Sequence, residues 1–169
     1  ILSLFLCISC GDEKKNDTPE TAKNEISFAA FLDDYYQKGL ELNPLSATSA
    51  GDNRYNDQFP NFLSEEHQEK MKTHYRTFKN DLKNYDDANL SESEQLSKAV
   101  LNWDCDMNLR QLSFKNDALM PINQMWTLNL SVGQLASGAG AQPFKTVEDY
   151  QNWLKRLEGY NTWINTAKE

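Results

Sequence analysis

Apolar residues recur at intervals of three and four along much of the 169-residue chain, and this spacing constrains the fold more than any other feature. It places apolar side chains on one face of an α-helix. Three segments show this spacing. The apolar residues of the first are Ile26, Phe28, Phe31, Leu32, Tyr35, Tyr36 and Leu40, and those of the second are Met71, Tyr75, Phe78 and Leu82. Those of the third are Leu96, Val100, Trp103, Met107 and Phe114. No segment alternates apolar and polar residues convincingly, as a half-buried strand would. The pattern predicts an all-α fold of antiparallel helices with long loops.

Capping and helix-breaking residues predict where the first two helices begin and end. The first is expected to begin near Asn24 and to end at Asn43, because the residue before a proline avoids the helical region. A long loop over 44–63 should follow. Ser64 is expected to cap the second helix, which should run to about Asn84.

Two capping boxes predict the starts of the later helices. Ser91 with Glu94 should open the third helix, and Thr146 with Asp149 should open the last one. Asp106 and Arg110 lie four residues apart on the third helix, which predicts an exposed ion pair.

The first ten residues, 1–10, carry no charge and end in Cys10. The run is too short to cross a bilayer, which needs about 20 apolar residues, and it is typical of the end of a signal peptide. Because a small residue, Ser9, precedes Cys10 and a polar segment follows, the pattern resembles a bacterial lipoprotein signal whose cysteine is lipidated. The alternative is an ordinary secretory signal with an incidental cysteine.

This interpretation divides the chain into a signal-peptide remnant at 1–10, a flexible tether at 11–24 and a helical region at 25–169. Two or more acyl chains on Cys10 would hold the protein on a membrane, so we expect a bacterial cell-envelope protein, periplasmic or surface-exposed. The helical pattern still runs at Glu169 without a stop signal. We therefore expect 25–169 to be the N-terminal region of a longer, mostly helical domain.

Few side chains suit catalysis. A net charge of −8 argues against nucleic-acid binding. His67 and His74 lie seven residues apart on one helix, about 10.5 Å along its axis, so they cannot share a zinc ion and are expected on helix surfaces. Cys105 lies in a helical pattern and is expected to be a small buried residue rather than a nucleophile.

The stretch 118–147 has Lys145 as its one charged residue and includes three glycines. It lacks the Gly-Lys-Ser/Thr ending of a phosphate-binding loop. An uncharged stretch of this kind is either buried between helices or lines a cleft.

Several segments in order resemble the N-terminal part of the domain-of-unknown-function 885 family. They are 42–51 with 55–57, then 120–124, then 142–150 followed by 153–157. The resemblance covers about 26–169. It implies a mostly helical bacterial protein of several hundred residues, often a lipoprotein and similar to zinc carboxypeptidases of the gluzincin kind. The family's metal motif and catalytic glutamate lie in its C-terminal half, so the resemblance assigns no catalytic or metal residue here.

In that family the N-terminal helices are thought to pack over the catalytic cleft. The resemblance makes Asn123, Gln124, Gly133 and Gln134 candidates for cleft or substrate contact; the alternative is that they tie the stretch to neighbouring helices. The implied function is the N-terminal part of a membrane-anchored, peptidase-like metal hydrolase, inactive by itself, with zinc and a peptide-like substrate in the whole protein. A lipid-anchored helical binding module without catalysis is the alternative.

Overall fold

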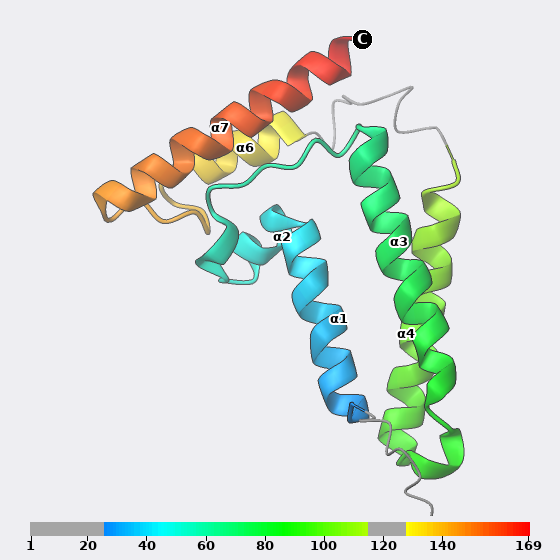
Figure 1. The fold of residues 1–169 in the computed structure, drawn as a ribbon. Helices are drawn as coiled ribbons and strands as arrows, with labels where there is room; N and C mark the ends of the chain where they lie inside the picture. Colours follow the sequence, from blue (N-terminus) through cyan, green and yellow to red (C-terminus); the bar gives the residue numbers. More distant parts are fainter. Residues whose placement is uncertain (1–25, 115–127) are drawn as a thin grey trace, which may run out of the picture.

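The computed structural model describes residues 26–114 and 128–169 (Figure 1). Its helices are α1 (Phe28–Leu42), α2 (Pro44–Ser49), α3 (Glu65–Asp81), α4 (Glu92–Gln111), α6 (Leu128–Ala136) and α7 (Val147–Lys168). Short 3-10 turns cover Asn53–Tyr55, Leu82–Asn84 and Asp87–Asn89. These two ranges contain no strand, so the predicted all-α fold is confirmed. None of the helices in them is long and apolar enough to cross a bilayer.

Helices α1, α3 and α4 form one side of the molecule, with α3 and α4 antiparallel (Figure 1). Their shared core is here called the first cluster. Its buried members are Phe28, Phe31, Phe78, Leu82, Leu101 and Cys105. The aromatic rings meet mostly at tilted or edge-on angles, for example Phe31 with Phe78 at 5.3 Å between centroids, a favourable arrangement for ring quadrupoles.

Helices α6 and α7 lie side by side at the other end of the molecule (Figure 1). They pack on the extended segment that leads into α3, and their core is here called the second cluster. Its buried members are Phe59, Val132, Leu135, Trp153 and Trp163. Helix α2 lies at the junction, directly after α1.

The helix starts predicted from side-chain caps are largely confirmed. Ser64 Oγ accepts a hydrogen bond from the His67 amide, and the boxes of Ser91 with Glu94 and of Thr146 with Asp149 are complete. The first helix is capped by Ser27 rather than by Asn24.

The predicted loop over 44–63 was wrong at its start, because Pro44 opens α2 directly after α1 ends at Asn43. Proline suits the first helical position, where its missing N–H would have no partner in any case. The Asn43 Oδ1 accepts a hydrogen bond from the Ser46 amide and caps the new helix. The proline therefore ends one helix and begins the next.

The orientation of α4 also differs from the prediction. Its inward residues include Leu101 and Cys105, whereas the apolar stripe identified in the sequence is exposed at Leu96, Val100, Trp103, Met107 and Phe114. The predicted ion pair of Asp106 with Arg110 was wrong as well, since Asp106 pairs with Lys79 of α3. Helix α4 thus turns the side that carries Leu101 and Cys105 to the first cluster and leaves the predicted stripe outside.

The two histidines are less exposed than predicted. His74 is only 8% exposed and stacks on Tyr35 in the first cluster with 4.9 Å between ring centroids, so its predicted surface position was wrong. His67 is half-buried against the edge of Phe62. Cys105 is fully buried, as predicted, and burial raises the pKa of its thiol to about 11.

Gly159 shows how closely α7 approaches the segment before α3. A Cβ at this position would lie 2.5 Å from the carbonyl oxygen of Phe59. No side chain fits at that distance, so only glycine lets the helix and the segment meet here.

Candidate functional site

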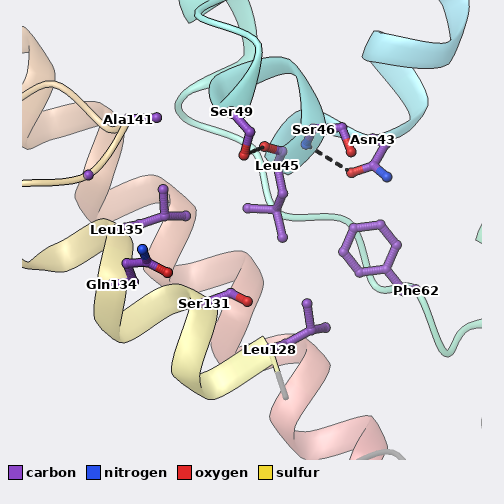
Figure 2. A pocket seen from close by; sticks show the side chains of 11 residues that line it. Asn43, Leu45, Ser46, Ser49, Phe62, Leu128, Ser131, Gln134, Leu135 and Ala141 are labelled. Atoms are coloured by element: carbon purple, nitrogen blue, oxygen red, sulfur yellow. Dashed lines mark hydrogen bonds between the residues drawn. The ribbon is translucent and has the colours of Figure 1, made fainter. Parts of the chain in front are cut away.

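A groove of about 700 Å³ lies between α2 and α6 (Figure 2). It is a candidate for a binding site because it is concave and combines apolar side chains with a few polar groups. The lining residues are Asn43, Leu45, Ser46, Ser49, Phe62, Leu128, Ser131, Gln134, Leu135, Gly140 and Ala141.

The first wall is built by the α2 helix and its cap. Leu45 points toward α6, with Ser46 and Ser49 on the same helix (Figure 2). The Ser49 hydroxyl donates a hydrogen bond of 2.9 Å to the Leu45 carbonyl oxygen. Because a serine hydroxyl both donates and accepts, its oxygen can still accept from a ligand.

The opposite wall is one face of α6. Leu128, Ser131, Gln134 and Leu135 follow the three- and four-residue spacing of a helix face, and Figure 2 shows their side chains directed toward α2. The turn after α6 brings Gly140 and Ala141 to the rim. Gly140 is required there, because a Cβ would lie 2.9 Å from the Gln134 carbonyl oxygen.

A fully buried arginine holds the first wall to the rest of the second cluster. Arg156 of α7 is 0% exposed. Its Nε donates to the Gln58 carbonyl oxygen at 3.0 Å and its Nη2 donates to the Tyr55 carbonyl oxygen at 2.6 Å. The same Nη2 lies 2.9 Å from the Thr48 hydroxyl of α2.

The arginine also reaches the turn that follows α6, where its Nη1 donates to Gln142 Oε1 at 2.6 Å. Burial lowers the pKa of Arg156 to about 10, and the nearby Asp57 carboxylate opposes that shift. The guanidinium is therefore charged at neutral pH, and its fixed fork of donors joins α2, the segment after it and the far rim. The shape of the groove depends on this side chain.

The lining side chains are uncharged. Amides and hydroxyls supply both donors and acceptors, and leucine and phenylalanine side chains supply apolar area. Such a lining suits binding and orientation of a neutral ligand. It offers no group that would serve as a general acid or base near neutral pH.

The residues that the sequence suggested for cleft contact do not all lie in the groove. Gln134 lines the groove, whereas Gly133 is exposed on α6 and is not part of the lining. Asn123, Gln124 and Cys10 lie outside the described residues. Substrate contact of the four cleft candidates and lipidation of Cys10 stay predictions.

Both interpretations of the uncharged stretch apply to α6. Val132 is buried in the second cluster, and Ser131 and Gln134 line the groove. Leu135 belongs to both the cluster and the groove lining.

The sequence reasoning missed Arg156. A signal was available, because this cation lies on the same helical face as Trp153 and Trp163, where a surface arginine is not expected. Its partners could not be read from the sequence, since Gln58 is 98 residues away.

Zinc does not fit the described residues. They contain no group of three or more His, Cys, Asp or Glu side chains that could hold a metal ion. A zinc site takes three or four such ligands within about 2.3 Å of the ion.

The described residues form an all-helical fold with an uncharged groove beside a buried arginine. The family model described as "Bacterial protein of unknown function (DUF885)" matches residues 44–169, and the chain belongs to this family. Comparison with curated proteins and with solved structures gives no significant match.

Proposed function

We propose that this chain is the N-terminal, non-catalytic part of a membrane-anchored, peptidase-like metal hydrolase, and that the groove between α2 and α6 contacts an uncharged segment of a peptide-like substrate. The observation that carries the proposal is the uncharged lining, with amides and hydroxyls on both walls beside leucine side chains.

The lining chemistry matches an extended peptide. Each peptide residue offers one N–H donor and one carbonyl acceptor, and Asn43 and Gln134 can serve both from opposite sides. Leu45, Leu128 and Leu135 supply apolar contact for side chains. A charged substrate side chain would lose hydration there without gaining an ionic partner, so the groove favours neutral residues.

The metal site would lie in another part of the whole protein, because the described residues contain no suitable group of zinc ligands. An exposed apolar face on α7 supports the proposal that the chain is part of a larger protein. Val147, Tyr150 and Leu154 follow helical spacing and are each more than half exposed, which is unusual for a face that has no partner.

The groove is tested with Gln134→Glu in the protein expressed from its complete reading frame. Neutral fluorogenic peptides are the substrates. A carboxylate in the uncharged groove should raise KM about tenfold, which corresponds to about 1.4 kcal/mol, and leave kcat within twofold. Asn129→Asp is the matched control, since it makes the same chemical change on an exposed position of α6 outside the lining.

Equal KM values for the two variants would refute substrate contact in the groove. Loss of wild-type hydrolysis on adding a chelator supports the metal hydrolase. Peptide binding without hydrolysis would instead favour the lipid-anchored binding module.

Membrane anchoring through Cys10 is tested separately. In a bacterial host, globomycin should cause the unprocessed precursor to accumulate, and Cys10→Ser should move the protein out of the membrane fraction. Processing that is insensitive to globomycin would favour an ordinary secretory signal.

A further inference from the structure

Helix α4 carries an exposed apolar stripe with a regular spacing. Leu96, Val100, Trp103 and Met107 are separated by four, three and four residues and are 39–67% exposed. Arg110 is the next position of the alternation on α4 and is also exposed. A strict alternation of three and four is the spacing of a seam that pairs with another helix. These five residues are here called the α4 seam.

We propose that the α4 seam pairs antiparallel with the α4 seam of a second copy of this chain. A two-fold interface brings the same surface of both copies together, so each contact occurs twice. The register that places Val100 against Trp103 of the second copy also places Leu96 against Met107. Every apolar position from Leu96 to Met107 then meets an apolar position.

The charges of α4 are complementary in this register. Its first turn is acidic at Glu92 and Glu94, and its last turn carries Arg110. The register places Arg110 of one copy against Ser93 of the other, beside Glu92. Glu92 and Arg110 are exposed, and neither forms an ion pair with another described residue. A parallel pair would instead bring the two arginines together and the two acidic turns together.

The size of the seam sets the expected strength. From Leu96 to Met107 it runs eleven residue steps, about 17 Å at 1.5 Å per residue. That is short for a stable coiled coil, and the chain carries a net charge of −8. The dimer should therefore be weak, concentration-dependent and favoured by moderate salt, which screens the repulsion between copies.

The test is sedimentation velocity on the protein expressed from its complete reading frame with Cys10→Ser, so that no acyl chain holds copies together. Wild type should shift from monomer to dimer as concentration rises. Arg110→Glu and Glu92→Arg should each weaken the dimer several-fold, and the double variant should regain it. Rescue is specific to the antiparallel arrangement, because only there does residue 110 lie next to residue 92 of the other copy.

Trp103→Glu should abolish dimerisation, while helix content by circular dichroism stays unchanged because the side chain is exposed. Thr77→Glu introduces the same carboxylate at an exposed position of α3 and is the control, which should leave the dimer intact. A wild-type protein that stays monomeric at all concentrations would overturn the proposal. So would a dimer that Trp103→Glu leaves unchanged, or single charge reversals that the double variant does not rescue.

Discussion

The two clusters are held together by different interactions. The first cluster is made of helices that follow one another in the chain, and its core is mainly aromatic. The second cluster joins α7 to segments about a hundred residues earlier, and a buried cation supplies many of the bonds across that distance. The first is therefore stabilised mainly by packing, and the second depends on directional hydrogen bonds as well.

Each cluster contains a polar arrangement, part-buried in the first and buried in the second, and these also differ. In the first cluster the Tyr35 hydroxyl donates to Asp104 Oδ2, and Asn108 Nδ2 donates to Asp104 Oδ1 at 3.1 Å. Burial, followed by the Asp104 carboxylate, raises the pKa of Tyr35 well above its usual range. This arrangement links side chains of α1 and α4. The Arg156 arrangement of the second cluster instead holds backbone carbonyls of an irregular segment.

The largest effect is expected from Arg156→Met. The variant leaves the Gln58 and Tyr55 carbonyls and Gln142 Oε1 without the donor that satisfies them, and each buried acceptor left without a donor costs about 1–3 kcal/mol. Urea unfolding followed by tryptophan fluorescence measures the loss. Lys155→Met, at a neighbouring exposed position, should change the unfolding free energy by less than about 0.5 kcal/mol.

Hydrogen exchange on the same variant tests the separation of the clusters. Amides of α7 should lose protection in Arg156→Met while those of α3 keep it. Equal loss of amide protection in both helices would show that the two clusters unfold as one unit, which would contradict their separate stabilisation.

A smaller loss is expected from Leu101→Ala in the first cluster. Leu101 is 5% exposed between α4 and its neighbours, and removing a buried leucine side chain costs about 2–4 kcal/mol. The adjacent Asn102→Ala is the control, because Asn102 is exposed on the same helix. Here protection should fall in α3 and persist in α7. A cost below about 1 kcal/mol would mean that the packing at this position is loose.

The sequence predicted the local features of both clusters and missed the distant ones. A helix cap such as Ser64 bonds to a residue three positions away, so it can be predicted from the local sequence. The spacing along α4 identified an apolar face, but spacing alone does not say which face is buried. Gln134 became a candidate through the family resemblance, whereas Arg156 was missed because its carbonyl partners lie about a hundred residues away.

A matched pair of glycines tests how closely the second cluster is packed. Gly159→Ala places a Cβ 2.5 Å from the Phe59 carbonyl oxygen, and such overpacking costs about 1–3 kcal/mol. Gly133→Ala adds a methyl group where nothing lies within 4 Å, so it should stabilise α6 by about 0.5–1 kcal/mol. Thermal unfolding compares the two. A neutral Gly159→Ala would show that the segment before α3 can move away from α7 at little cost.

The smallest effect is a pH dependence that differs between the clusters. Burial lowers the pKa of His74 in the first cluster, with Lys38 adding to the shift and Asp34 and Asp104 opposing it. Burial also lowers the pKa of His67 beside the second cluster, with Lys70 adding to the shift and Glu66 opposing it. The unfolded chain therefore binds more protons than the folded one just below the ordinary histidine pKa of about 6.5.

Stability should accordingly fall as the pH drops from about 7 to 5, because acid favours the state that binds more protons. His74→Phe keeps an aromatic ring against Tyr35 and should remove the pH dependence of protection in the part of α3 around His74, while that of the first turns of α3, around His67, remains. His67→Phe should do the reverse. Hydrogen exchange at both pH values separates the two sites, once corrected for the intrinsic exchange rate. Either variant could instead remove the pH dependence of protection around both histidines. The two histidines would then be coupled, and the two clusters would unfold together in acid rather than separately.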